Sequence, residues 1–308
     1  MEDFPKTILE FEKCFSSEEA CLQYLYQLRW PDGFICPRCG CRSAWKTKRD
    51  LYRCRGCDYQ VSITAGTIFQ DTHKPLQTWF RAIWQITSQK YGANALGLKR
   101  VLGIGSYRTA WTWLHKLRTA MVRPDRERLS GTIEVDETYL GGQKSGKRGR
   151  GAPGKTLVLI ACELKGKRIG RIRLYLLKDA SSESLISAIR ELIEPGSTIQ
   201  TDDWSGYGSL KDSEFQHIII RESSNLGDTL LPHAHLVAAL LKRWLLGTYQ
   251  GAVRPSHLDY YLDEYTFRFN RRASGSRGKL FYRLIQQAVA IAPVKGCEIK
   301  GGASKHNI

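Results

Sequence analysis

The chain has 308 residues, and its 47 lysines and arginines exceed its 30 aspartates and glutamates by a formal net charge of +17. A charge of this sign and size indicates a polyanionic partner, with nucleic acid first and an acidic membrane surface second. Hydrophobic residues make up 42% of the sequence, including 8 Trp, 14 Tyr and 10 Phe, which excludes a disordered basic tail. No apolar run approaches the roughly 18 residues that a membrane span needs, and the first residues lack a signal-peptide pattern. We therefore expect a soluble, cytoplasmic protein of about two domains.

The first 29 residues are expected to form an N-terminal helical segment, 1–29. Ser16 and Ser17 are followed by Glu18 and Glu19, which is typical of a capping box at the start of a helix. Apolar residues at helical spacing follow these four positions, as a short amphipathic helix requires.

Four of the nine cysteines form two close pairs. Cys36 and Cys39 are separated by two residues, as are Cys54 and Cys57, and 14 residues separate the pairs. Two such pairs on tight turns allow four thiolates to bind one zinc ion tetrahedrally at about 2.3 Å, and four ligands leave no place for water. The odd number of cysteines argues against a disulfide framework. We predict a zinc ribbon over residues 30–64 with a structural zinc ion, and buried structural thiols are the alternative.

A helix-turn-helix is expected within the next segment, residues 65–123. Residues 95–102 predict a first helix, 103–105 a glycine turn, and Ser106 the start of a basic second helix. This arrangement places side chains in a DNA major groove, although helical hairpins without a DNA role are common. The candidate DNA contacts on the second helix are Arg108, Lys116 and Arg118.

From Gly131 the pattern changes to that of an α/β domain, which we place at residues 124–292 with a flexible tail at 293–308. Strands are expected at 132–136, 157–161, 169–177 and 198–201, and a helix at 181–193.

A basic, glycine-rich stretch lies between the first two of these strands and predicts a hairpin loop. Such a loop is able to follow a DNA backbone, but a solvated loop has the same composition. Its candidate DNA contacts are Lys144, Lys147, Arg148 and Arg150.

Two aspartates are expected to meet at the ends of neighbouring strands. Asp136 ends the first strand and Asp202 follows the fourth. Carboxylate oxygens suit Mg²⁺, and a pair of such ions stabilises both the attacking and the leaving oxygen in phosphoryl transfer. Glu134 shares the strand face of Asp136 and is an auxiliary candidate, whereas Glu137 and Asp203 point the other way. Aspartates that merely begin a loop are the alternative.

A third ligand is expected from a helix over residues 235–247. At 100° per residue, His235 and Lys242 fall about 20° apart on one helix face. His235 is placed to complete the metal site and Lys242 to hold the DNA backbone. A helix-terminal histidine without a metal and a solvated lysine are the alternative.

Five further segments carry a resemblance to a known family, and with the cysteines they span most of residues 18 to 290 in order. They are Thr64–Phe69, Glu134–Gly142, Thr201–Tyr207, Leu241–Tyr249 and Phe267–Arg272. Together they resemble bacterial insertion-sequence transposases with an N-terminal zinc ribbon and an RNase H-like catalytic domain, the group related to Merlin elements. In this family the acidic triad (DDE-type) is Asp, Asp and then Glu, Asn or His, with a Lys seven residues later. The resemblance therefore implies catalytic roles for Asp136, Asp202, His235 and Lys242.

The resemblance also implies a DNA transposase, which binds the terminal inverted repeats of its insertion sequence and catalyses metal-dependent strand cleavage and strand transfer. The implied cofactors are structural Zn²⁺ and catalytic Mg²⁺ or Mn²⁺. The implied partners are terminal-repeat and target DNA and further copies of the chain, with nucleoid association when DNA is bound.

Two other functions are compatible with parts of the sequence. One is a catalytically inactive or repurposed sequence-specific DNA-binding protein. The other is a rolling-circle nuclease with a covalent tyrosine-DNA intermediate, because His233 and His235 flank an apolar residue and tyrosines follow.

Overall fold

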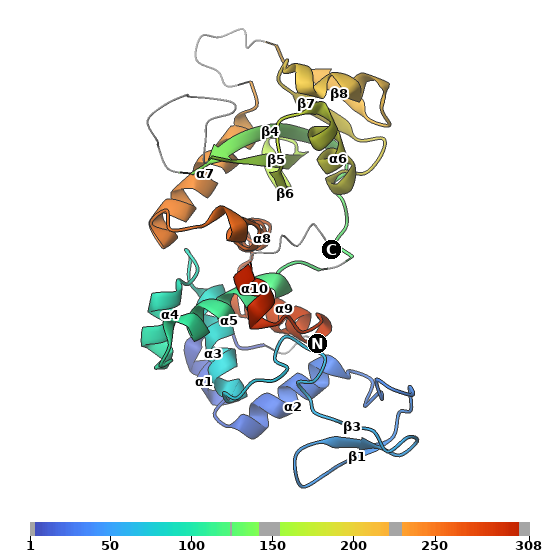
Figure 1. The fold of residues 1–308 in the computed structure, drawn as a ribbon, viewed down its shortest axis with the longest axis vertical. Coiled ribbons are helices and arrows are strands. Elements are labelled where there is room, and N and C mark those ends of the chain that lie inside the picture. Colours follow the sequence, from blue (N-terminus) through green and yellow to red (C-terminus); the bar gives the residue numbers. More distant parts are fainter. Residues whose placement is uncertain (1–3, 124, 142–154, 222–229, 302–308) are drawn as a thin grey trace. The chain divides into compact units, whose positions relative to one another are not determined.

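The computed structural model describes residues 4–123, 125–141, 155–221 and 230–301. The chain divides into two compact units (Figure 1): the first contains residues up to 123 together with Ser274–Gly301, and the second contains the residues between them. The sequence suggested an α/β domain that runs to residue 292, but the chain returns to the first unit at Ser274. None of the helices in the described ranges combines the length and apolar character needed to cross a membrane.

The N-terminal part of the first unit joins two helices to a small antiparallel sheet of order β1-β2-β3. Its elements are α1 (Ile8–Cys14), α2 (Glu18–Arg29), β1 (Ala44–Lys46), β2 (Tyr52–Cys54) and β3 (Gln60–Val61). Helix α2 begins as the capping pattern predicts, because the Ser17 hydroxyl accepts a hydrogen bond from the Ala20 amide at 3.2 Å.

The rest of the first unit is helical. It contains α3 (Leu76–Ser88), α4 (Ala95–Leu102), α5 (Tyr107–Ala120), α9 (Arg277–Ala290) and α10 (Gly296–Gly301). Helix α9 packs against α3, and α4 packs against α5. Gly103 ends α4 in the left-handed conformation, with φ of 61°, so the predicted helix, glycine turn and second helix are all present. Residues 296–301 are helical where we expected a tail.

Helix α3 obtains its N-terminal cap from another helix. Its own N-cap residue is Pro75, which makes no side-chain capping bond. Instead, the carboxylate of Glu18 accepts hydrogen bonds from the amides of Leu76 at 2.6 Å and Gln77 at 3.1 Å. The start of α3 is therefore fixed by the position of α2.

The second unit is built on one five-stranded sheet of order β6-β5-β4-β7-β8. Its strands are β4 (Thr132–Leu140), β5 (Thr156–Lys165), β6 (Arg168–Leu177), β7 (Thr198–Thr201) and β8 (Gln216–Ile219). Strands β4, β5 and β6 form an antiparallel meander, whereas β7 pairs in parallel with both β4 and β8. The helical elements are α6 (Ser182–Leu192), η1 (Ser205–Asp212), α7 (Pro232–Tyr249), η2 (Pro255–His257) and α8 (Leu258–Phe269).

Helices cover both faces of this sheet, with α6 and η1 on one and α7 and α8 on the other (Figure 1). Alternation along β4 assigns its side chains to the two faces. Ile133 and Val135 belong to the core beneath α6, whereas Leu140 belongs to the core beneath α7. Even-numbered residues of β4 therefore face α7.

Candidate functional site

The register of two neighbouring strands brings Asp136 and Asp202 to the same level. Thr132 to Glu134 on β4 pair in parallel with Thr198 to Gln200 on β7. Continuing this register by two residues sets Asp136 beside Asp202, on strands spaced about 4.8 Å apart. We expected Asp136 at a strand end, but β4 continues to Leu140, so Asp136 lies within the strand at the place where β7 ends.

His235 approaches Asp136 from helix α7. Its Nε2 lies 3.2 Å from Oδ2 of Asp136, while half of the imidazole remains exposed. Burial, together with the negative charges of Glu137 and Asp202, raises the pKa of Asp136 to about 6 against the attraction of His235. Three of the predicted site residues, Asp136, Asp202 and His235, therefore lie in one electrostatically coupled group.

Glu134 has a different role from the auxiliary ligand that we expected. Its carboxylate is 3% exposed and faces α7 from β4. It accepts hydrogen bonds from the amides of His233 and Ala234, both at 2.9 Å, and from His233 Nδ1 at 2.6 Å. The N-cap residue of α7, Leu231, has no side-chain capping bond. Glu134 is therefore the N-terminal cap of α7, and it sets the start of the helix that carries His235.

The two carboxylates expected to point away from the site have other partners. Glu137 accepts a hydrogen bond from the hydroxyl of Tyr207 at 2.6 Å, and Tyr207 belongs to the core beneath α6. The exposed carboxylate of Asp203 pairs with Arg221 at 3.3 Å.

Lys242 is exposed on α7, two helical turns beyond His235. It lines a cavity of about 510 Å³ together with Leu245, Leu246 and the C-terminal end of β4. Among the described residues, Lys242 is the only charged side chain that lines this cavity, and most of the other lining residues are apolar.

The two histidines of the rolling-circle hypothesis lie on a helix and have separate partners. His233 binds Glu134 and His235 contacts Asp136, so the imidazoles do not converge on one ligand position. Tyr260 and Tyr261 are buried. These positions give no support to a tyrosine nucleophile next to a histidine pair.

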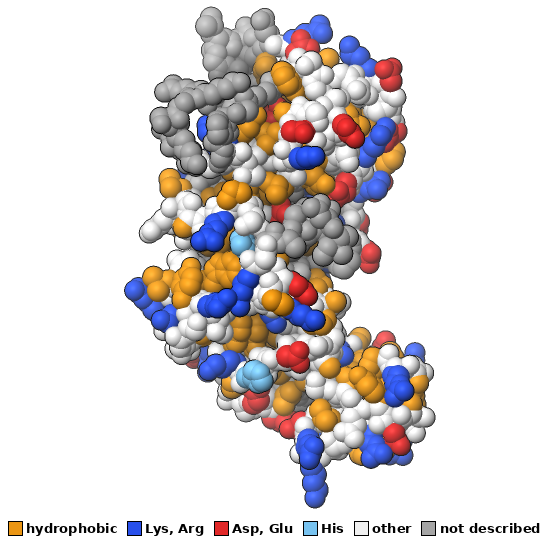
Figure 2. Space-filling model, viewed as in Figure 1, with side chains coloured by type: hydrophobic (Ala, Val, Ile, Leu, Met, Phe, Trp, Pro, Cys, Tyr) orange, Lys and Arg blue, Asp and Glu red, His pale blue; other side chains and the backbone are white. Residues whose placement is uncertain are grey.

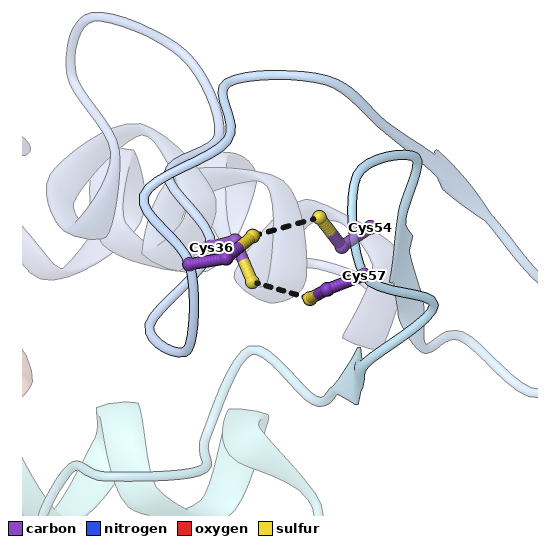
Figure 3. Close-up of side chains that lie close together, drawn as sticks. Cys36, Cys54 and Cys57 are labelled. Carbon is purple, nitrogen blue, oxygen red and sulfur yellow. Dashed lines mark hydrogen bonds between the residues drawn. The ribbon is translucent and has the colours of Figure 1, made fainter.

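The four predicted zinc ligands converge (Figure 3). Cys36 Sγ lies 3.7 Å from Cys57 Sγ, and Cys39 Sγ lies 3.6 Å from Cys54 Sγ. All four sulfurs lie within 4.8 Å of one another. Tetrahedral zinc with bonds of about 2.3 Å requires sulfurs roughly 3.8 Å apart, so the cluster fits this ion.

Backbone geometry closes the two turns of the cluster and favours the thiolate of Cys36. The residue after each cysteine pair has a positive φ, 73° at Gly40 and 55° at Asp58, which closes the two tight turns. Burial acts to raise the pKa of Cys36, but hydrogen bonds, including those from the Arg38 and Cys39 amides, lower it to about 7. In the described ranges, no second group of three or more His, Cys, Asp or Glu has its ligand atoms this close together.

The candidate DNA contacts have different surroundings. Arg108 is exposed and Lys116 is half-buried. Arg118 is only 1% exposed and lies against His115, so its guanidinium is part of the core and the prediction of a surface contact is wrong for this residue. The buried stripe of α5 includes Trp113, Leu114 and Leu117, which places Arg118 on the inner face. Lys144, Lys147, Arg148 and Arg150 lie outside the described residues.

The first prediction concerns the cap of α7. Glu134→Ala leaves two buried amides without their acceptor, so the second unit should lose about 2–4 kcal/mol of stability. Hydrogen exchange of the first turn of α7 should accelerate, with Glu134→Gln intermediate. Glu18→Ala is the matched control, because it removes the equivalent cap and should accelerate exchange at the start of α3 alone. An unchanged first turn of α7 in Glu134→Ala would contradict the assigned role.

The second prediction concerns the cysteine cluster. Cys54→Ser should weaken zinc binding by more than the roughly 10–100-fold that loss of an outer contact produces, because it removes a ligand. Metal content after dialysis measures this loss. Cys41→Ser is the control, since the Cys41 thiol contacts the Ser43 carbonyl at 3.8 Å instead of a sulfur of the cluster. Equal zinc retention in both variants would argue against the four-cysteine site.

Comparisons with known proteins agree with this architecture. Residues 128–270 match the ISXO2-like transposase domain, and residues 16–60 match the transposase zinc-ribbon domain. An uncharacterised protein in the transposable element ISH50 of Halobacterium salinarum is 27% identical over 266 residues, which cover 76% of this chain and 85% of that protein.

Two solved structures have lower similarity. The catalytic core domain of BIV integrase aligns with 15% identity and a TM-score of 0.33, over 48% of this chain and 89% of that one. A chain of the simian T-cell lymphotropic virus intasome, in complex with a PP2A regulatory subunit, aligns with 14% identity and a TM-score of 0.32, over 65% and 74%.

The matched domains occur in the predicted order, and the α/β architecture with an N-terminal zinc ribbon is confirmed. The chain therefore carries a transposase zinc-ribbon domain ahead of an ISXO2-like transposase domain.

Proposed function

We propose that this transposase is a DDE-type enzyme, which binds the terminal inverted repeats of its element and catalyses metal-dependent cleavage and strand transfer of DNA. The observation that carries the proposal is the convergence of Asp136, Asp202 and His235, which come from β4, the end of β7 and α7. His235 contacts Asp136, and the strand register sets Asp202 beside Asp136, within the domain that matches the transposase family.

The chemistry of these donors suits a divalent cation. Asp136 and Asp202 repel each other, and this repulsion contributes to the raised pKa of Asp136. Asp136 and Asp202 would hold a cation, whose positive charge would offset that repulsion. Mg²⁺ or Mn²⁺, when bound, polarises a phosphoryl oxygen and activates the attacking oxygen. Asp136 binds the cation only when its carboxylate is ionised. Lys242, which lies on the same helix as His235, holds the DNA backbone.

DNA recognition is assigned to the first unit. The zinc ribbon and the α4–α5 pair bind the terminal repeats, with Arg108 and Lys116 among the contacts. Figure 2 shows lysine and arginine side chains spread over both units, as contacts with an extended polyanion require. The basic residues between β4 and β5, at 144 to 150, bind the DNA backbone, and pairing of two element ends requires more than one copy of the chain.

The third prediction tests the catalytic assignment. Asp136→Asn or Asp202→Asn should reduce strand cleavage at element ends by at least about 1,000-fold, because each variant removes a metal ligand. Binding of the same DNA should persist. Asp203→Asn is the matched control, since that neighbouring carboxylate pairs with Arg221 and should be dispensable.

The readout is cleavage of a labelled duplex with Mg²⁺, beside a mobility-shift assay. Cleavage retained by either purified active-site variant refutes the assignment. A wild-type protein that binds the ends and cleaves nothing supports the non-catalytic alternative.

The fourth prediction concerns stability without metal. The pKa of Asp136 is raised from 3.8 to about 6, so the folded state holds the proton more tightly than the unfolded chain. Stability therefore falls as pH rises from about 4 to 6, and the ionised carboxylate destabilises the fold above pH 6. Asp136→Asn should raise the unfolding free energy of metal-free protein by roughly 1–3 kcal/mol at neutral pH.

Denaturant unfolding of both proteins in a chelator measures this difference, which should shrink below pH 4. Asp203→Asn should change stability by less than about 0.5 kcal/mol. A loss of stability in Asp136→Asn at neutral pH would contradict the assigned electrostatics.

A further inference from the structure

The first unit contains a cavity of about 430 Å³ on one side of α5. Three separate parts of the chain form it: the turn at residues 71–74, residues 106–116 at the start and along α5, and α10 near the C-terminus. Trp79 and Trp113 also line it, and their rings stack with centroids 3.7 Å apart, which gives the cavity a rigid aromatic wall.

The lining of this cavity is strongly basic. Lys74, Arg108, Lys116 and Lys300 all contribute, against the single carboxylate of Asp71. In the described part of the chain, none of these four cations lies within ion-pair distance of a carboxylate. Burial lowers the pKa of Lys116, and the charge of Asp71 opposes that shift. Four cations around one concavity repel each other, and a bound anion relieves that repulsion.

Helix α10 is held against α5. The Ile299 side chain is fully buried, and a Cβ at Gly296 would lie 3.4 Å from Cγ2 of Thr112 on α5. This packing explains how Lys300, which is distant in sequence, reaches the same cavity as Lys116. At the start of α5, next to the cavity, the Ser106 hydroxyl makes no capping bond to the first turn of the helix.

We propose that this cavity, the α5 basic pocket, binds a phosphodiester of the DNA backbone together with its neighbouring sugar. The proposal rests on the DNA-binding role proposed for α5. A helix that lies in a major groove has a sugar-phosphate backbone beside it, and the pocket opens along α5 itself. The volume exceeds that of one phosphate group and therefore has room for the attached deoxyribose. Helix α10, which follows the catalytic domain in sequence, is thereby part of the end-binding machinery.

The test uses the full chain with Lys116→Gln, Lys300→Gln and the double variant. Lys13→Gln is the matched control, because Lys13 is exposed in the last turn of α1 and does not line the pocket. Equilibrium binding is measured to an element-end duplex and to a scrambled duplex of equal length, between about 50 and 200 mM salt. Circular dichroism melting confirms that all variants are folded.

Each single variant should weaken binding to both duplexes by a similar factor, roughly 5–10-fold near 0.1 M salt, and reduce the salt slope by about 1. The double variant should lose less than the product of the two single effects, because both lysines contact one phosphate. The proposal is wrong if Lys300→Gln keeps the wild-type DNA affinity and salt slope. It is also wrong if the double variant loses the full product of the two single effects.

Two further results distinguish this proposal from the proposed function and from binding of a free phosphate compound. If wild-type protein does not prefer the element end, the proposed function fails, yet the scrambled duplex still reports the phosphate contact. If calorimetry with inorganic phosphate shows binding that the variants lose while their DNA affinity is unchanged, the pocket serves a free phosphate compound and the DNA proposal is wrong.

Discussion

The buried carboxylate of Glu134 is the interaction on which the site depends. It lies on the face of β4 that also presents Asp136, and it accepts hydrogen bonds from two backbone amides in the first turn of α7. Burying a carboxylate is costly, but hydrogen bonds to a charged acceptor contribute about 1.5–3 kcal/mol each, and this one accepts three. Because the cap fixes where α7 begins, it also fixes His235 beside Asp136. Glu134, which lies outside the proposed catalytic group, thus sets the position of His235 within it.

The same device occurs in the first unit, where Glu18 on α2 caps α3. Both capped helices begin at a proline or next to one, and neither has a side-chain cap of its own. Proline sets the backbone at the first turn but supplies no acceptor for the amides that follow. A carboxylate from another element supplies it, so each helix starts correctly only when its neighbour is in place. Local helix formation and tertiary packing are coupled at both positions.

Sequence patterns predicted the parts of this protein that depend on spacing. The paired cysteines identified a cluster whose sulfurs do converge, and the apolar strands placed Asp136 and Asp202 on neighbouring strands. Contacts made between distant segments were missed. Glu134, which caps α7, lies 100 residues before Ala234 in the sequence, so no local motif contains both residues. Arg118 was misplaced because its charge suggested exposure, whereas the helix period carries it inward. The return of α9 to the first unit is likewise set by packing against α3.

The histidine in the proposed third ligand position changes the electrostatics of Asp136. Burial and the charges of Glu137 and Asp202 all raise the pKa of Asp136, whereas His235 lowers it. A carboxylate in place of His235 would add a further repulsion and shift Asp136 toward its neutral form. The imidazole therefore keeps Asp136 closer to the ionised form that binds a cation. It also brings no negative charge, so in the proposed metal site the attraction for a divalent ion would come from the carboxylates and not from His235. Compared with a carboxylate, histidine at this position thus adds less repulsion to Asp136 and Asp202, and it also adds less attraction for the proposed cation.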